Sequence, residues 1–376
     1  MNRNVKIAGL VIALVIVAAV VVYFSTPRLG GSGSGPRIAL NLALTGPVAA
    51  ASGEYPRAFQ MGLDEAGARL SVDPARFKLT IADNKGTAKD AITSFQQQKA
   101  TGFDAYISGL SYASVAIAPE LDEGSVPHLM LAFDSFITEK GDNRFRILPN
   151  YKIQGPKFAE YVKLRNAKRV YMLTSDNSFV GEEFSNFVEP AMRSAGVQFQ
   201  RESFAITTSD YRTLSLKALE FKPDLILIDC LSFQMLPLIQ SLRAGGYKID
   251  GNILGSMDFI FLLYGSEGIP ADVRGVTFIS PLFEIPGGVP GADEWRKRYL
   301  ARGGKDPNFI QAYAYDTAQV LMESYKRFGN VRPENLDKVF PYDGICGRLT
   351  LDKHRDLVSD LGFAKVSLTG TKEKYQ

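Results

Sequence analysis

The stretch HLMLAFDSF, residues 128–136, places one carboxylate at the end of an apolar run. Residues 128–132 are almost all apolar and predict a buried strand, and Phe133 and Asp134 follow where that strand should end. In sheets built from parallel strands, ligands lie beyond the carboxyl ends of the strands. The chemistry that this strand end can offer is noncovalent: hydrocarbon surface for an apolar group and one carboxylate for a polar group.

Residues able to do covalent or metal chemistry are scarce. The two histidines fall in unrelated settings, His128 in the apolar strand and His354 in the charged turn DKHRD. The sequence contains no nucleophile elbow, no P-loop, no H-E-x-x-H motif and no cluster with metal-ligand spacing. Cys230 and Cys346 form no C-x-x-C motif, and two small buried residues are favoured over a disulfide, which the spacing leaves open. We therefore expect a binding protein without enzyme activity, cofactor or metal.

Composition and net charge indicate a globular protein and argue against nucleic acid as its partner. The chain has 376 residues, 45% hydrophobic and 22% charged, which is typical of a globular protein. The net charge of +3 is small, and no block of five or six basic residues occurs, so nucleic acid is not an expected partner. The length that remains after the first 35 residues fits two domains of ordinary size.

The amino-terminal segment predicts contact with a membrane. Arg3 and Lys6 precede residues 7–24, which carry no charge and would span roughly 27 Å as a helix. We interpret residues 1–24 as a membrane anchor that leaves the body outside the cytoplasm. A cleaved signal peptide is the alternative, although apolar residues continue through VVVYF, where a cleaved signal should turn polar. Residues 25–35, rich in Gly and Ser, predict a flexible linker.

Beyond Arg37 the chain alternates short apolar strands with amphipathic helices. The first series of strands is predicted at 38–44, 77–83, 105–110 and 128–133. The second series is predicted at 169–174, 197–206 and 224–229, followed by GNILGS and VTFISPL. Such alternation predicts parallel sheets covered by helices on both faces, and two series predict two doubly wound, Rossmann-like α/β lobes.

Six segments in sequence order resemble one known family. They are LALTGPVAAASGEYPRAFQMGLDEA, ISGLSYASVAIAPELDEGSVP, FRILPNYKIQG, FVGEEF, QAYAYDTAQVLMES and GICGRLTLD. Together they resemble the branched-chain-amino-acid type of periplasmic solute-binding protein, which has the type I fold and serves ABC transporters. The resemblance covers nearly the whole chain after Pro36.

The resemblance implies an architecture and a partner. Three crossovers would fall near Pro149, Pro281 and Phe340. They would give one lobe of 36–149 plus 283–339 and another of 150–282 plus 340–376. The resemblance further implies a ligand held in an interlobe cleft, lobe closure by hinge motion, and delivery by a monomer to an inner-membrane transporter.

The sequence departs from the family where ligand motifs are expected. Residues 111–114 keep part of a Ser-Ser-type turn that holds a ligand carboxylate, but residues 130–134 replace a small polar strand end with hydrocarbon and one carboxylate. Residues 179–180 replace a tyrosine of the second lobe, and residues 256–258 contain the place for an acidic residue that holds an ammonium group. Residues 51–52 replace a bulky cover and leave more room for the ligand.

These positions define the predicted ligand site. Its residues are Ser52, Ser111, Tyr112, Phe133, Asp134, Phe179, Val180, Phe233, Met257, Asp258, Phe259 and Phe283. Each aromatic residue could instead belong to the core, and either aspartate could cap a helix. An apolar wall with few polar points favours an apolar or amphipathic ligand, lipid-like or sterol-like. A branched-chain amino acid or amide is the alternative, and a ligand-sensing receptor domain is the third interpretation.

Overall fold

The computed structural model of the protein describes residues 35–375 except 47, 122–123, 177–179 and 265–267. The predicted anchor or signal of residues 1–24, most of the predicted linker, and Phe179 lie outside the described residues. Within the part of the chain that is described, no helix combines the length and the apolar character needed to cross a bilayer.

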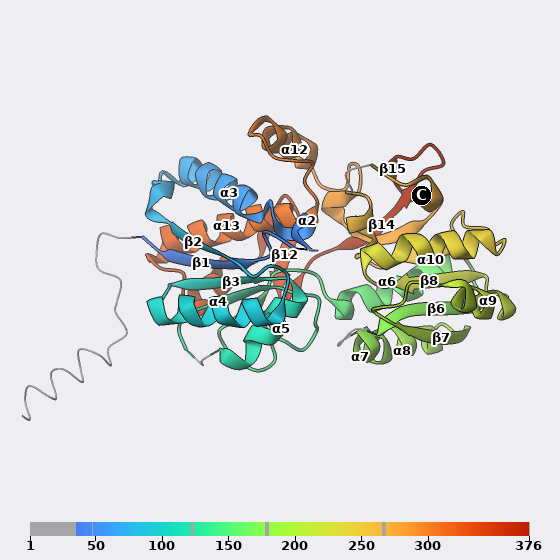
Figure 1. Ribbon diagram of the computed structural model, residues 1–376. Coiled ribbons are helices and arrows are strands. Elements are labelled where there is room, and N and C mark those ends of the chain that lie inside the picture. Colours follow the sequence, from blue (N-terminus) through green and yellow to red (C-terminus); the bar gives the residue numbers. More distant parts are fainter. Residues whose placement is uncertain (1–34, 47, 122–123, 177–179, 265–267, 376) are drawn as a thin grey trace, which may run out of the picture.

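The first lobe is built on a five-stranded parallel sheet of order β2-β1-β3-β4-β5. Its strands are β1 (Arg37–Leu42), β2 (Lys78–Asp83), β3 (Ala105–Gly109), β4 (His128–Leu131) and β5 (Arg144–Arg146). Its helices are α2 (Ala49–Ser52), α3 (Tyr55–Leu70), α4 (Ala88–Thr101), α5 (Ser111–Ile117), α12 (Ala292–Ala301), α13 (Phe309–Phe328) and α14 (Pro333–Leu336). Helices α3 and α13 cover one face of the sheet, and α4 and α5 cover the other (Figure 1).

Helix α13 returns to this lobe late in the sequence and packs closely on α3. Its start is fixed by a capping box, in which the Asn308 side chain accepts from the backbone and Gln311 reaches back. Its end is fixed by Gly329, whose φ of 71° suits the left-handed cap position. A Cβ at Gly62 would lie 2.6 Å from the carbonyl oxygen of Tyr315, so only glycine allows this close approach of the two helices.

The second lobe is built on a seven-stranded sheet of order β15-β14-β10-β9-β8-β6-β7. Its strands are β6 (Arg169–Asp176), β7 (Gln198–Ala205), β8 (Leu225–Asp229), β9 (Ile253–Gly255), β10 (Thr277–Pro281), β14 (Leu361–Val366) and β15 (Lys372–Lys374). The first five of these pair in parallel, and β14 and β15 are antiparallel. Strand β8, LILID, is buried along its whole length, as expected for a central strand covered on both faces.

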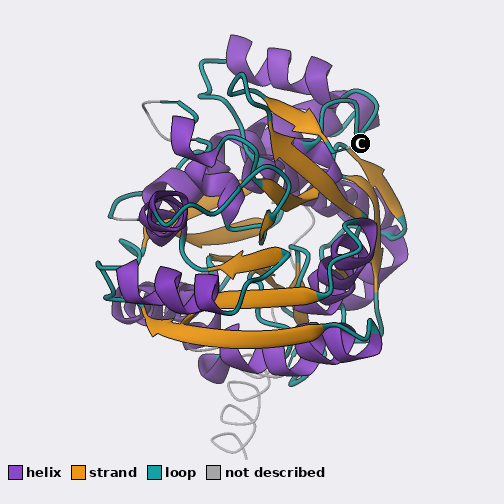
Figure 2. Cartoon of the chain, turned by 90° about the vertical axis from the view of Figure 1, so that its right-hand side faces the viewer, coloured by secondary structure: helices purple, strands orange, loops and turns teal. Residues whose placement is uncertain are grey.

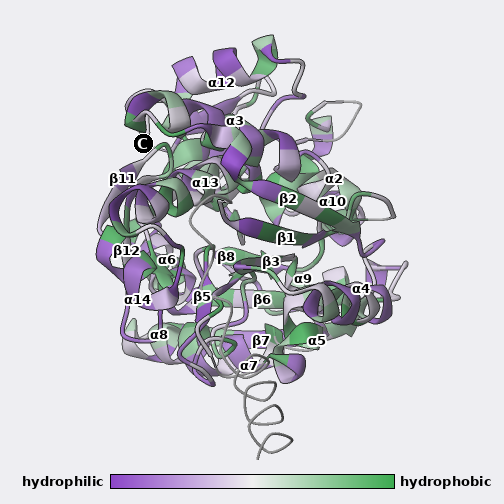
Figure 3. Ribbon diagram, turned by 90° about the vertical axis from the view of Figure 1, so that its left-hand side faces the viewer, coloured by the Kyte–Doolittle hydropathy of each residue, from purple (hydrophilic) through white to green (hydrophobic). Residues whose placement is uncertain are grey.

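Helices cover both faces of this second sheet (Figure 2). They are α6 (Tyr151–Leu164), α7 (Val180–Glu183), α8 (Glu189–Ser194), α9 (Arg212–Glu220), α10 (Ser232–Ala244) and α11 (Phe259–Leu262). Helix α6 packs with α8, whereas α10 packs with α9 and α11. Hydrophilic residues gather on outward helices such as α12 (Figure 3). The prediction of two α/β lobes is confirmed.

A third, small sheet was not predicted. It consists of β11 (Tyr342–Gly344), β12 (Gly347–Leu351) and β13 (Leu357–Val358), and it joins neither large sheet. The buried carboxylate of Asp316 on α13 accepts hydrogen bonds from the backbone N–H groups of Ile345 and Cys346, and Asp356 forms a bridge with β5 of the first lobe. We propose that the boundary expected near residue 340 lies instead between Val358 and Leu361, where the chain returns to the second lobe.

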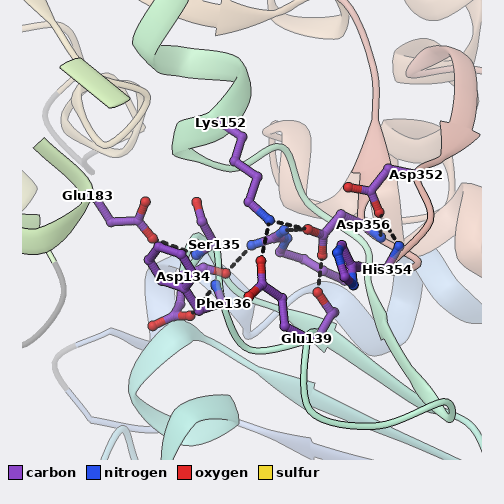
Figure 4. A network of polar contacts seen from close by, with 11 residues as sticks. Asp134, Ser135, Phe136, Glu139, Lys152, Glu183, Asp352, His354 and Asp356 are labelled. Atoms are coloured by element: carbon purple, nitrogen blue, oxygen red, sulfur yellow. Dashed lines mark hydrogen bonds and ion pairs between the residues drawn. The ribbon is translucent and has the colours of Figure 1, made fainter. Parts of the chain in front are cut away.

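A buried ionic network stands where the chain first passes between the lobes (Figure 4). Asp356 is 2% exposed and pairs with the guanidinium of Arg146, which is fully buried. Thr138 donates a hydrogen bond to the same carboxylate. Lys152, the second residue of α6, lies 3.3 Å from Asp356 and 3.0 Å from Glu139. The network joins the first lobe, the third sheet and the start of the second lobe.

A second buried carboxylate stands at the next crossing. Glu284, which follows β10, is 1% exposed and pairs with Lys372 of β15. It also lies 3.6 Å from Arg296 of α12 and accepts a hydrogen bond of 2.6 Å from the hydroxyl of Tyr264. Both crossings are therefore held by a carboxylate that has its own cations.

Removing the carboxylate of Asp356 should destabilise the protein strongly. Asp356→Ala leaves Arg146 buried and unpaired, and breaking a buried ion pair in this way costs about 3–5 kcal/mol. Urea unfolding checks the loss. The matched control is Asp343→Ala, which breaks an exposed Arg–Asp pair with Arg348 and should change stability little. Equal losses in the two variants would contradict the structural role of Asp356.

Candidate functional site

Two neighbouring strands of the second lobe end in a hydrogen-bonded cluster. Asp229 is the last residue of β8, and Ser256 directly follows β9, which pairs with β8 in parallel. The buried carboxylate of Asp229 accepts hydrogen bonds from the hydroxyl of Ser256 at 2.6 Å and from the hydroxyl of Tyr151. Tyr151 begins α6, immediately after the first crossing between the lobes. Burial raises the pKa of the Asp229 carboxyl.

A second carboxylate lies beside this cluster without a counter-charge. Asp258 is partly buried, and its side chain makes no cap hydrogen bond to α11. Among the described residues no hydrogen bond or ion pair to its carboxylate is found. Burial raises its pKa, and the negative charge of Asp229 raises it further. The helix-capping alternative for Asp258 is therefore not what the structure contains.

A third carboxylate reaches from the second lobe toward the first. Glu183, the last residue of α7, is fully buried, and its Oε1 accepts a hydrogen bond of 2.5 Å from the backbone N–H of Ser135 (Figure 4). Its Oε2 is buried and has no hydrogen-bond partner among the described residues. Burial raises the pKa of the Glu183 carboxyl to about 7, and the charge of Asp134 adds to the rise.

The charges of these three carboxylates act on one hydroxyl group. The pKa of the Tyr151 hydroxyl is raised first by burial and then by the charges of Asp229, Asp258 and Glu183. The cations near this group are already paired, since Arg146 binds Asp356 and Lys152 binds Glu139 and Asp356. The charges that act on the Tyr151 hydroxyl are therefore negative.

The first lobe contributes polar groups at its own strand ends. The Ser111 hydroxyl accepts a hydrogen bond of 3.0 Å from the Phe133 N–H and keeps its own proton for another acceptor. The Tyr112 hydroxyl donates to the side chain of Asn84 at 2.8 Å. Asp134 accepts from the Phe136 N–H at 2.9 Å, which is a local turn, and its backbone carbonyl accepts from Arg146.

Most of the predicted apolar wall packs in the cores of the lobes. Met257 is fully buried, and Phe259 lies against Phe278 of β10 with ring centroids 5.0 Å apart. Phe283 meets Trp295 edge-on at 5.5 Å. Phe133 and Val180 are also buried. The structure therefore gives these side chains protein partners in place of a ligand.

The remaining predicted residues fall in different places. The fully buried Ser52 donates a hydrogen bond to the carbonyl of Ala43, and Phe233 lies on the surface with 65% exposure. Aromatic contacts also cross between the lobes. Phe136 stacks on Phe187 with ring centroids 6.0 Å apart, and Phe261 of α11 lies 5.4 Å from Phe309, which itself lies 6.5 Å from Phe133. Of the predicted residues, the structure brings Asp258 into the carboxylate group and Asp134 within its electrostatic reach.

Four residues of this group were not among the predicted ligand residues. They are Tyr151, Glu183, Asp229 and Ser256. The sequence pattern could have indicated Asp229, because this residue directly follows the apolar run DLILI. Ligands of such sheets lie beyond the carboxyl ends of the strands. No such pattern indicates Glu183, because GEEF offers two adjacent carboxylates and only the fold shows that Glu183 is buried while Glu182 is exposed.

The profile of the family described as periplasmic binding protein matches residues 36–372. No curated protein matches the sequence. Among solved structures, the leucine-binding protein LivK from Thermotoga maritima is 22% identical, with a TM-score of 0.76 over 91% of this chain and 98% of that one. LivJ from Streptococcus pneumoniae, in complex with isoleucine, is 20% identical with a TM-score of 0.77 over 91% and 99%. A solute-binding protein of an ABC transporter from Rhodopseudomonas palustris, in complex with 3,4-dihydroxybenzoic acid, is 18% identical with a TM-score of 0.75 over 91% and 96%. These likenesses show a shared fold.

Replacing Glu183 with glutamine should change how stability depends on pH. Because its folded pKa of about 7 lies above the ordinary value of 4.5, folding favours the protonated form, and stability falls as the pH rises from 4.5 through 7. Glu183→Gln cannot ionise, so between pH 5 and pH 8 it should gain about 3 kcal/mol relative to the unsubstituted protein. Urea unfolding of both proteins across this range measures the difference. The matched control is the exposed neighbour, Glu182→Gln, whose curve should run parallel to that of the unsubstituted protein; a parallel curve for Glu183→Gln would contradict the assignment.

Proposed function

The chain belongs to the periplasmic binding protein family, and we propose that it captures a small nitrogen-bearing solute between its lobes and delivers it to an ABC transporter. A branched-chain amino acid or amide is the class of solute that we favour. The similarity in fold to proteins named for leucine and crystallised with isoleucine supports this class. The family places the protein in the periplasm, and a tether through residues 7–24 remains part of the proposal.

One observation supports the choice of solute. Asp229 ends β8, Asp258 lies between β9 and α11, and the charge of Asp229 acts on the Asp258 carboxyl, while no lysine or arginine of the described chain forms an ion pair with either. Keeping two carboxylates close together without a cation raises the free energy of the ionised site. A ligand with N–H donors or a positive charge lowers this free energy. An ammonium group and an amide both supply such donors.

The lipid-like or sterol-like ligand gains no support. The aromatic residues expected to line an apolar wall are packed against protein side chains, as Phe259 is against Phe278 and Phe283 against Trp295. A sterol would also leave Glu183 Oε2 buried without a hydrogen-bond partner and the partly exposed Asp258 without a counter-charge. Asp258 and Phe259 lie at the start of α11, after β9 has ended, and there Phe259 packs against Phe278 whereas Asp258 stays partly exposed.

The proposed mechanism is noncovalent. A solute nitrogen would bind the carboxylates of the second lobe, and closure would bring the strand ends of the first lobe, with the Ser111 hydroxyl, over the solute. The ion pairs of Asp356 and Glu284 would hold the crossing segments while the lobes move about them. Release to the transporter would follow reopening.

Calorimetric titration tests this function. Leucine, isoleucine, valine and leucinamide should bind, whereas 3,4-dihydroxybenzoate and a sterol should not. Asp258→Asn should weaken binding by about tenfold or more, because a hydrogen bond to a charged group contributes roughly 1.5–3 kcal/mol. The matched control is Asp250→Asn, which removes an exposed carboxylate of the same lobe that pairs with Lys365. Tight binding of the sterol or of dihydroxybenzoate, unchanged in Asp258→Asn, would refute the proposal.

A further inference from the structure

We propose that the first turn of α6, residues 151–154, positions the aspartates at the strand ends of the second lobe and couples them to the first crossing between the lobes. Tyr151 and Gln154 are positioning residues, since they act on the solute through Asp229 and Asp258. The inference rests on the proposed function, which assigns these two aspartates to the solute.

One side of this turn holds the ends of two neighbouring strands. The Tyr151 hydroxyl donates to Oδ2 of Asp229, the last residue of β8, and the Ser256 hydroxyl donates to Oδ1 at 2.6 Å. Oε1 of Gln154 accepts a hydrogen bond of 3.3 Å from the backbone N–H of Met257, which lies between β9 and α11. Tyr151 and Gln154 are each 1% exposed, so water cannot replace either bond. The turn therefore fixes where the ends of β8 and β9 lie relative to α6.

These bonds orient the two aspartates and leave them able to bind a solute. An ionised carboxylate has about four acceptor sites, and the two hydroxyl donors fill one on each oxygen of Asp229. Asp258 directly follows Met257, so the bond from Met257 to Gln154 holds the backbone from which the Asp258 side chain extends. A shift of the turn therefore changes the position of both carboxylates.

The other side of the turn belongs to the ionic network at the first crossing. Lys152 lies 3.0 Å from Glu139 of the first lobe and 3.3 Å from Asp356, which also pairs with Arg146. Figure 4 shows the Lys152 side chain extending from the start of α6 toward these carboxylates. Its Nζ lies 5.8 Å from the centre of the Phe136 ring, which also belongs to the first lobe. A movement of the first lobe relative to α6 therefore acts on this turn through Lys152.

A proline separates the turn from the rest of α6. Pro156 lies inside the helix, and it has no N–H to donate to the carbonyl of Lys152, four residues earlier. The body of the helix is fixed to the sheet independently, because the Tyr161 hydroxyl bonds to the carbonyl of Gly251 at 2.9 Å and to the hydroxyl of Thr277 at 3.0 Å. The first turn can therefore shift with Lys152 while the rest of α6 stays in place.

Two matched tyrosine substitutions on α6 test the positioning role. Tyr151→Phe and Tyr161→Phe each remove a buried hydroxyl group, and both should lower the urea midpoint of unfolding by similar amounts. In calorimetric titrations of the full-length protein with leucine at pH 7.5, only Tyr151→Phe should weaken binding, by about tenfold. Tyr161→Phe should leave the affinity unchanged, because Tyr161 bonds near the opposite ends of the strands. If Tyr151→Phe does not fold, Gln154→Met tests the same turn, and it should weaken leucine binding as well.

A double-substitution cycle tests the coupling to the crossing. Lys152→Met removes the ammonium group at the crossing and keeps most of the length of the side chain. Its effect on the leucine dissociation constant should differ by at least about threefold between the unsubstituted protein and Tyr151→Phe, because the Tyr151 hydroxyl carries the change to the strand ends. The control Lys157→Met breaks an ion pair with Glu160 on the same helix, and its effect should be the same in both backgrounds.

The possible results separate this inference from the proposed function. If Asp258→Asn weakens leucine binding but Tyr151→Phe and Tyr161→Phe change it equally, the inference is wrong and the proposed function stands. The same holds if the effects of Lys152→Met and Tyr151→Phe are additive. If the unsubstituted protein binds none of leucine, isoleucine, valine and leucinamide, both are wrong.

Discussion

The cost of burying a carboxylate governs this structure. An ionised carboxyl removed from water needs an opposite charge or several hydrogen bonds, or its pKa rises until it is neutral. The protein meets this requirement fully at the two crossings between its lobes, through Asp356 and Glu284, and leaves it unmet between the lobes, at Glu183 and Asp258. The satisfied carboxylates hold the fold together, and we propose that the unsatisfied ones contribute to the binding site.

This division links ligand binding to lobe closure. Glu183 already accepts a hydrogen bond from Ser135 of the opposite lobe, and the aromatic pair of Phe261 and Phe309 also bridges the lobes. A ligand nitrogen that binds the carboxylates of the second lobe would lower the electrostatic penalty of bringing Asp134 toward them. The differential affinity of the ligand for the closed state is what shifts the equilibrium between open and closed forms.

The fold was largely predictable from the sequence, and the site was not. Short apolar runs such as DLILI are strands because both faces of a central parallel strand are buried, so periodicity and length identify them. The small third sheet escaped prediction because its attachment depends on Asp316, a carboxylate inside a helix distant in sequence. The site was hard to predict because the sequence does not show which individual side chains contribute to it. Asp258 and Phe259 are adjacent in sequence, yet one joins the carboxylates and the other packs in the core, and only the tertiary contacts decide which faces the ligand.

The central claim is that the carboxylates of Asp229 and Asp258 hold a nitrogen-bearing group of the solute between the lobes. A crystal structure of the protein with bound leucine tests this claim most directly. The account predicts that the ammonium nitrogen lies within hydrogen-bond distance of the Asp258 carboxylate, at the carboxyl ends of β8 and β9. A leucine nitrogen bound away from both carboxylates would contradict it.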